Sequence, residues 1–237
     1  MQNGGAMIMR TAVFAVPLHI MTVSSEYIRF ANRADAGRQL AQRLLPHAGA
    51  DSVVYALPRG GVIPGAEVAR VLHAPLSLII TRKIGHPSDP EYAIGAVAED
   101  GHFIADSAII ATVDAHWLRA EIERQKVEAM RRREIYLAGA QPIDPAGKIA
   151  IIIDDGIATG LTMKCAIAEL KHRNPQKIVV AVPVAPPDSL AEIGALVDAV
   201  VCLTAPTSMG AIGTYYDSFP QVEDGEVIKL MQSLTTS

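Results

Sequence analysis

Short runs of apolar residues alternate along this chain with segments in which apolar residues recur every three or four positions. The short runs predict buried strands, and the helical spacing predicts helices that cover them. Strands that are apolar throughout and joined by helices are typical of a mainly parallel sheet with both faces covered. We therefore predict an α/β fold with strands at residues 53–57, 76–81, 148–153, 177–184 and 199–203 and helices at 33–45, 62–72, 114–138, 161–172, 188–197 and 222–231.

Two neighbouring stretches break this alternation. Residues 82–93 contain a glycine and two prolines among small polar residues, and we expect them to form a long irregular loop. Residues 94–98 and 102–105 flank the turn sequence Glu-Asp-Gly and predict a hairpin.

The start of the chain differs from the rest. The apolar run after Arg10 resembles a secretory signal, but Pro17 and His19 interrupt it and no small-residue cleavage site follows. We expect residues 1–25 to be an N-terminal extension that is disordered or precedes the true start. Residues 26–237 are then a single domain.

The composition excludes several classes of protein. Half of the 237 residues are hydrophobic and only 5% are aromatic, so aliphatic side chains must build the core. The net charge of −4 offers no basic surface for nucleic acid. Cys165 and Cys202 form neither a disulfide framework nor a four-ligand zinc set. No apolar run reaches the roughly 20 residues of a membrane helix. We expect a cytoplasmic protein that binds neither nucleic acid nor membranes.

The strongest motif in the chain is the string IIIDDGIATGLT at residues 151–162. A buried strand brings Asp154 and Asp155 to the edge of the sheet, where their carboxylates can accept hydrogen bonds from the vicinal diol of a ribose. The N–H groups of residues 159–162, at the start of the next helix, form an anion cradle that two threonine hydroxyls complete. An acidic pair alone could be a solvated turn or a helix cap, but the full string favours a site for ribose 5-phosphate.

Four further strings accompany this motif: ALPRGGVIPGAEVA at 56–69, RKIGHPSDPEYAIGAVAEDG at 82–101, VVCLTAP at 200–206 and GTYYDSFPQVEDGEV at 213–227. The string at 151–162 resembles the phosphoribosyl-pyrophosphate binding motif of type I phosphoribosyltransferases. More narrowly, residues 27–227 resemble a group of stand-alone members of that family. The resemblance implies the type I fold, with a small hood at about residues 204–225 and a flexible lid at 82–93. It also implies a homodimer.

The same resemblance implies an activity. A phosphoribosyltransferase uses phosphoribosyl pyrophosphate and magnesium to transfer ribose 5-phosphate to a nitrogenous base, and it releases pyrophosphate. The lid excludes water from the reacting ribose, which would otherwise be hydrolysed.

Site residues carried over from the family fall into three groups. The ribose and its 5-phosphate would contact Asp154, Asp155, Gly156, Ala158, Thr159, Gly160, Leu161 and Thr162. Pyrophosphate would contact Arg59, Gly60, Gly61, Arg82 and Lys83. The catalytic residues would be Asp154, Asp155, Arg82 and Lys83, and the two aspartates would hold magnesium through water. A small residue is more usual in this family where Leu161 stands, and the loop tolerates leucine if the side chain points away.

An aromatic cluster near the C-terminus has two interpretations. Tyr215, Tyr216 and Phe219 lie close to Asp217. They could be a small packed cluster under the last helix. Alternatively, the tyrosines form a hood that stacks on a flat base while Asp217 reads its edge. Glu91 in the lid is either a surface carboxylate or a functional acid.

Two other functions share the phosphate-binding residues. One is a non-catalytic sensor that binds phosphoribosyl pyrophosphate and reports to a partner. The other is a domain that binds a different sugar phosphate. The helix at 114–138 carries charges of both signs, which indicate a solvated face or a dimer interface. Scattered histidines and the absence of a G-x-S-x-G string give no support to a zinc hydrolase or an esterase.

Overall fold

The structure of the protein is a computed structural model that describes residues 20–24, 28–138 and 141–235. Its centre is a six-stranded sheet in which every neighbouring pair of strands is parallel. In spatial order the strands are β1 (Ile20–Ser24), β9 (Ala199–Thr204), β8 (Lys177–Val184), β7 (Ile149–Ile153), β2 (Ser52–Ala56) and β3 (Leu76–Leu78). The predicted α/β class with a mainly parallel sheet is confirmed.

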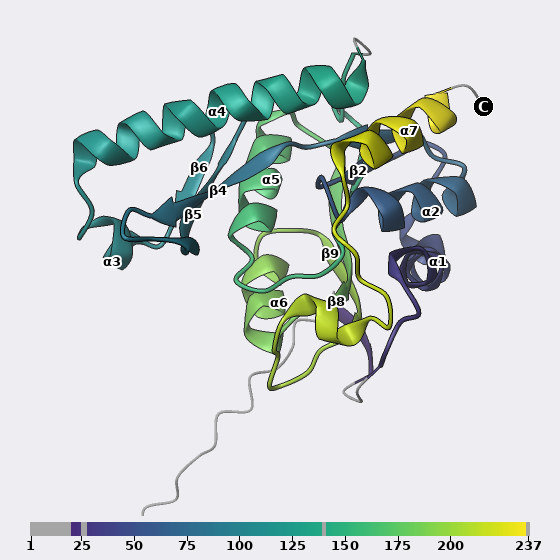
Figure 1. Ribbon diagram of the computed structural model, residues 1–237. Helices are drawn as coiled ribbons and strands as arrows, with labels where there is room; N and C mark the ends of the chain where they lie inside the picture. Colours follow the sequence, from purple (N-terminus) through teal and green to yellow (C-terminus); the bar gives the residue numbers. More distant parts are fainter. Residues whose placement is uncertain (1–19, 25–27, 139–140, 236–237) are drawn as a thin grey trace, which may run out of the picture.

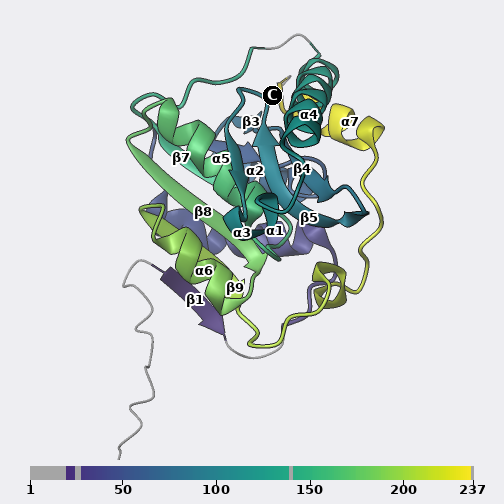
Figure 2. The same ribbon diagram turned by 90° about the vertical axis from the view of Figure 1, so that its left-hand side faces the viewer.

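Helices cover both faces of this sheet (Figures 1 and 2). One face packs against α1 (Arg33–Leu44) and α2 (Val62–Leu72), and the other against α5 (Leu161–His172) and α6 (Pro187–Gly194). Successive residues of β7 alternate between the two cores: Ala150 and Ile152 join the α5 side, whereas Ile151 and Ile153 join the α1 side. Both faces are therefore buried, and this explains why the strand is apolar throughout.

A second sheet of three antiparallel strands projects from the body of the molecule (Figure 1). It consists of β4 (Thr81–His86), β5 (Asp89–Ala98) and β6 (Phe103–Ala105). The predicted hairpin of residues 94–98 and 102–105 is confirmed by the β5–β6 pairing. The expectation that residues 82–93 form an irregular loop is wrong, because most of them belong to β4 and β5.

The local sequence of this hairpin explains the error. Pro90 lies in the outer half of β5, which is exposed, and the β4–β5 register shifts on both sides of Gly85. A side chain on Gly85 would collide with the backbone of Pro90. Glycine and proline thus fit together in an irregular pair of strands, as they do at bulges and sheet edges.

The remaining elements connect the small sheet to the C-terminus. The long helix α4 (Ala115–Leu137) follows the short α3 (Ser107–Ile110) and runs from β4 to α7 (Asp224–Thr235), as Figure 1 shows. Two short 3-10 turns, η1 (Leu45–His47) and η2 (Ile212–Tyr215), complete the structure. The charged residues of α4 form ion pairs within the helix, such as Arg124–Glu121 at 2.6 Å and Arg131–Glu128 at 2.7 Å.

The N-terminal prediction needs a partial correction. Residues 20–24, which we expected to lie in an unstructured extension, form β1 and pair with β9 at the edge of the sheet. Residues 1–19 lie outside the described residues. In the part of the chain that the structure describes, no helix is both long enough and apolar enough to span a bilayer.

Close packing of α1 on α2 gives a first testable prediction. A Cβ on Gly37 would lie 2.6 Å from Cα and 2.8 Å from the carbonyl oxygen of Pro64. We expect Gly37→Ala to lower the free energy of unfolding by about 1–3 kcal/mol, because the helices must separate. Urea unfolding at equilibrium measures this change.

Gly225→Ala is the matched control. Gly225 lies in α7, and nothing stands within 4 Å of an added Cβ. This variant should gain up to about 1 kcal/mol, since alanine favours the helix. Equal effects of the two substitutions would contradict the packing argument.

Candidate phosphate and ribose site

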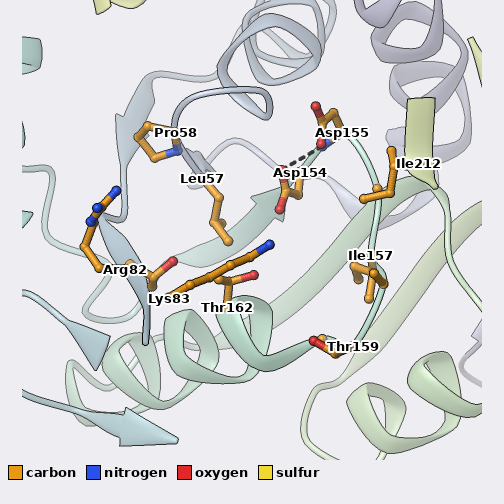
Figure 3. Close-up of a pocket in the computed structure, with 14 residues that line it drawn as sticks. Leu57, Pro58, Arg82, Lys83, Asp154, Asp155, Ile157, Thr159, Thr162 and Ile212 are labelled. Carbon is orange, nitrogen blue, oxygen red and sulfur yellow. Dashed lines mark hydrogen bonds between the residues drawn. The ribbon is translucent and has the colours of Figure 1, made fainter. Parts of the chain in front are cut away.

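A pocket of about 290 Å³ lies beyond the carboxyl ends of β2 and β7 (Figure 3). Ligands of open α/β sheets bind at this edge. Several parts of the chain that lie far apart in the sequence contribute to the pocket. It is lined by Leu57, Pro58, Thr81, Arg82, Lys83, Asp154, Asp155, Gly156, Ile157, Ala158, Thr159, Gly160, Thr162 and Ile212.

One wall is the loop that leads into α5. Gly160 adopts a φ of 75° directly before the helix, a left-handed conformation that a glycine accepts without strain. The first N–H groups of α5 have no partner within the helix, and Gly160 and Thr162 at this helix start line the pocket. Thr159 and Thr162 line the pocket, as Lys83 does. The residues predicted to bind the 5-phosphate therefore lie at one end of this pocket, with the exception of Leu161.

Leu161 does not line the pocket. Its side chain packs against the buried residues Ala96, Ala98 and Cys165, below the small sheet. The loop can therefore carry a large residue at this position, since the leucine points away from the cradle.

Asp154 presents its carboxylate to the pocket. Its Oδ1 accepts a hydrogen bond from the Asp155 N–H at 2.8 Å, and in Figure 3 the carboxylate and the Lys83 side chain point toward one another. Burial raises the pKa of Asp154 well above its usual value, and the neighbouring Asp155 raises it further. Lys83 opposes this shift. Ionisation of Asp154 is therefore costly, and a hydroxyl donor or a cation beside its carboxylate would offset this cost.

Asp155 is oriented differently. Its Oδ2 forms an ion pair of 2.7 Å with Arg33 Nε, and both side chains are largely buried, with exposed fractions of 13% and 7%. Its backbone carbonyl accepts a hydrogen bond of 2.6 Å from the Tyr216 hydroxyl. Figure 3 shows the side chain turned away from Lys83. Asp155 is thus held by Arg33 of α1 through its side chain and by Tyr216 through its backbone carbonyl.

The sequence Pro-Arg-Gly-Gly after β2 forms the adjacent loop, in which the Pro58–Arg59 peptide bond is cis. Pro58 lines the pocket, whereas Arg59, Gly60 and Gly61 do not. The Arg59 guanidinium instead lies 3.4 Å from Asp224 at the start of α7. The Arg59 side chain, which we predicted to bind pyrophosphate, is thus directed toward α7 rather than into this pocket.

Both glycines of this loop are required by packing. A side chain on Gly60 would collide with the Asp155 carboxylate, and a Cβ on Gly61 would lie 2.8 Å from the Ile153 carbonyl oxygen. The loop and the acidic strand end are therefore in direct contact. Gly60 also lines a second, more open hollow together with Arg59 and Asp155.

Arg82 and Lys83 are adjacent on β4 and point in different directions, because side chains alternate along a strand. Lys83 extends across the pocket toward Asp154 (Figure 3). Arg82 also lines the pocket, but its Nε donates a hydrogen bond of 2.9 Å to Gln125 on α4. The two cations, predicted to act together, therefore have different surroundings.

The predicted aromatic hood is not formed by the expected side chains. Tyr215 and Tyr216 are each only 2% exposed and belong to the core under α1. Tyr216 stacks on Phe219, with ring centroids 4.7 Å apart. Neither tyrosine presents a face to the pocket, so the interpretation as a packed cluster describes these two residues.

The other predicted residues of these segments also lie away from the pocket. Asp217 is exposed and forms an ion pair of 2.7 Å with Arg29. Glu91 is exposed on the outer part of β5. Ile212, at the start of η2, is the residue of the C-terminal segment that lines the pocket.

Sequence reasoning missed several residues of the site. Leu57, Thr81, Ile157 and Ile212 line the pocket, and each looked like an ordinary core or turn residue in the sequence. Arg33 was missed because its partner Asp155 lies 122 positions away. The only local sign of a role for Arg33 is that a charged residue stands at the start of an otherwise apolar helix face.

The described residues contain no group of three or more histidine, cysteine, aspartate or glutamate side chains placed to hold a metal ion. Asp154 and Asp155 remain as the carboxylates at the pocket. Such a set suits magnesium, which keeps several waters and often binds one or two carboxylates together with the phosphates of a substrate.

The chain is thus an α/β protein whose parallel sheet carries a helix N-terminus, an acidic strand end and a lysine around one pocket. Within this class, the model of the family described as "Phosphoribosyl transferase domain" matches residues 24–218. The chain belongs to the phosphoribosyltransferase family.

Similar proteins agree with this assignment. Two proteins from different strains of Mycobacterium tuberculosis, each named "Putative phosphoribosyl transferase", are 43% identical to this chain over 204 residues. The match covers 85% of this chain but 46% of each relative, so the chain spans about half the length of these curated relatives.

A solved structure is similar over almost its whole length. The crystal structure of TT1426 from Thermus thermophilus has a TM-score of 0.75 and 36% sequence identity. The match covers 87% of this chain and 99% of that one. This solved structure, at moderate sequence identity, thus has the same fold as this chain.

The raised pKa of Asp154 predicts that the ionised carboxylate lowers the stability of the protein. A carboxyl group whose pKa is higher in the folded state makes the protein less stable as the pH rises from about 4 toward the folded pKa. We expect Asp154→Asn to raise the unfolding midpoint at pH 7 and to have little effect at pH 3, where the wild-type side chain is protonated. Thermal unfolding at both pH values measures the difference, and a variant that is less stable at pH 7 would contradict the assignment.

Proposed function

We propose that this protein is a phosphoribosyltransferase that transfers ribose 5-phosphate from phosphoribosyl pyrophosphate to a nitrogenous base and releases pyrophosphate. The observation that carries the proposal is the shared pocket: Thr159, Gly160 and Thr162 at the start of α5 line one space of about 290 Å³ together with Asp154 and Lys83. Family membership supports the reaction class.

Each wall of the pocket suits one part of this substrate. The 5-phosphate accepts hydrogen bonds from the N–H groups at the start of α5 and from Thr159 and Thr162. The ribose hydroxyls donate to Asp154. Pyrophosphate lies between the loop at Pro58 and the Lys83 ammonium, which offsets its negative charge as it departs.

Magnesium would be held by the pyrophosphate and the ribose hydroxyls, with Asp154 or Asp155 contributing directly or through water. When bound, it supplies charge neutralisation for the leaving group. The residues of this chain position the ribose and exclude water from it. We further propose that the protein acts as a homodimer in the cytoplasm and that its product enters nucleotide salvage.

A second candidate is a sensor that binds phosphoribosyl pyrophosphate without transferring it. The burial of Tyr215 and Tyr216 favours this candidate, because neither ring presents a face on which a base can stack. Phosphate binding would be the same in the sensor and in the enzyme. The two candidates therefore differ only in whether the protein also binds an acceptor base and transfers ribose 5-phosphate to it.

The test of the enzyme is the release of pyrophosphate from phosphoribosyl pyrophosphate and magnesium. Adenine, guanine, hypoxanthine, uracil, orotate and nicotinate serve as acceptors, and a reaction without acceptor is the control. We expect release that depends on one class of acceptor. Tight binding of phosphoribosyl pyrophosphate without release of pyrophosphate in any reaction would support the sensor. The absence of binding would contradict both candidates.

The different directions of Arg82 and Lys83 give a further prediction. We expect Lys83→Gln to weaken the binding of phosphoribosyl pyrophosphate by about tenfold or more, because a cation that faces the pocket is worth at least ~1.4 kcal/mol. Arg82→Gln should weaken it less, since the Arg82 guanidinium is held by Gln125. Calorimetric titration compares the two variants. A larger effect of Arg82→Gln would contradict the assignment of Lys83 as the main cation for the ligand.

A further inference from the structure

Gln125 is a buried amide on α4, outside every motif that the sequence revealed. It is 7% exposed and lies where α4 runs along β4 (Figure 1). Its Oε1 accepts the hydrogen bond of 2.9 Å from Arg82 Nε, and its Nε2 donates to Glu121 Oε1 at 2.8 Å. A guanidinium only donates and a carboxylate only accepts, so these two partners determine which end of the amide faces Arg82. Gln125 therefore holds Arg82 in one orientation.

The amide holds Arg82 without neutralising it. Glu128 is the carboxylate that stabilises the charge of Arg82 from nearby, but it is already bonded to Arg131 and Arg132, at 2.7 and 2.8 Å. Burial lowers the pKa of the Arg82 guanidinium, and the positive charge of Arg132 lowers it further. Arginine nevertheless stays protonated in proteins. The guanidinium is therefore a partly desolvated cation that an anion beside it would stabilise.

α4 places this neutral side chain between two glutamates. Glu121 lies four residues before Gln125 and Glu128 three residues after it, so the three share one face of the helix. Each glutamate is paired with an arginine of the same helix, as Glu121 is with Arg124 at 2.6 Å. A glutamate at position 125 would accept the same hydrogen bond from Arg82 but would also cancel its charge. Glutamine supplies the acceptor alone.

Two other arginines at this edge are held in the opposite way. Arg33 pairs with Asp155 at 2.7 Å, and Arg59 lies 3.4 Å from Asp224. A carboxylate opposes each of these charges, whereas Arg82 lines the pocket and is bonded to a neutral partner. The bond that fixes Arg82 therefore leaves its positive charge available at the pocket.

Resting on the proposed function, we infer that Gln125 is a positioning residue, which holds Arg82 at the pocket through an uncharged hydrogen bond so that the guanidinium keeps its charge for the phosphates of the ligand. Glu121 acts one step further away, because it fixes the orientation of the Gln125 amide. A side chain that is already held in place also loses less conformational freedom when the ligand binds. Arg82 is then the second cation of the site, after Lys83.

A double-mutant cycle tests the link between Gln125 and Arg82. The readout is the calorimetric Kd of phosphoribosyl pyrophosphate with magnesium, measured on the full chain at a temperature where every variant is folded. We expect Arg82→Gln to weaken binding by about fivefold, through the loss of a charge. Gln125→Met removes the acceptor and keeps the length of the side chain. It should weaken binding by about threefold, since the ligand must then order a free guanidinium. The double variant should bind within about 1.5-fold of Arg82→Gln alone, because Gln125 then has no cation to hold.

Gln125→Glu tests the role of the charge. The new carboxylate keeps the hydrogen bond from Arg82 and neutralises the guanidinium. Relative to the wild type, we expect binding to weaken by about fivefold at about 0.05 M salt and by less at about 0.5 M, where ions screen the charge. Val127→Glu is the matched control, because it adds the same charge to α4 at a side chain that is 64% exposed. This control should bind within about 1.5-fold of the wild type at both salt concentrations.

Two results would overturn the inference. One is a Gln125→Glu variant that binds as tightly as the wild type, since a merely structural glutamine could be replaced by another acceptor of the same shape. The other is a loss of affinity in Gln125→Met that is just as large when Arg82→Gln is also present, because Gln125 would then act without Arg82. If Gln125→Met does not fold, the cycle uses Gln125→Asn, whose side chain is one methylene shorter and cannot reach Arg82 and Glu121 together.

The outcome is separable from that of the proposed function. A wild-type chain that does not bind phosphoribosyl pyrophosphate overturns the proposed function and this inference together. A wild-type chain that binds it without transferring it removes the enzyme, and the same variants then decide the inference, because their readout is binding.

Discussion

The parallel pairing of β2 with β7 is the constraint on which the rest of the structure depends. Ala56 pairs with Ile153, and the Leu57 N–H donates to the Ile153 carbonyl at 3.0 Å just beyond the strand. Both strands therefore end side by side, and the loops that follow share one edge of the sheet. The gap between the two loops is narrow enough that a Cβ on Gly61 would lie 2.8 Å from the Ile153 carbonyl oxygen and 2.9 Å from Asp154 Cα. Gly60 and Gly61 therefore allow the loops after β2 and β7 to lie side by side.

Much of the fold could be predicted because its signals are local. The strands of the central sheet are apolar throughout, since both faces are buried, and the helices repeat their apolar residues at helical spacing. The hairpin of residues 82–93 was mispredicted for the opposite reason. Its glycine and prolines are local breaker signals, whereas the strands form through a pairing in which Gly85 and Pro90 fit one another. Pairing between strands overrides local preference there.

The site shows the same division between local and distant information. The cradle of residues 159–162 and the carboxylate of Asp154 lie within one string, so their grouping could be predicted from the sequence. Arg33 could not, because only the folded chain brings it to Asp155. The aromatic cluster was ambiguous for a related reason. Sequence shows that Tyr216 is close to Phe219, but burial decides whether a ring packs inward or faces a ligand.

Two pairs of adjacent residues with like charge meet at this edge, and each pair is divided in the same way. Lys83 and Asp154 face the pocket and each other (Figure 3). Arg82 is bonded to Gln125 on α4, and Asp155 is bonded to Arg33 on α1. All four side chains belong to residues that line the pocket, but in each pair one residue is also bonded to a neighbouring helix. These bonds hold Arg82 and Asp155 in place, and Lys83 and Asp154 remain opposite one another in the pocket.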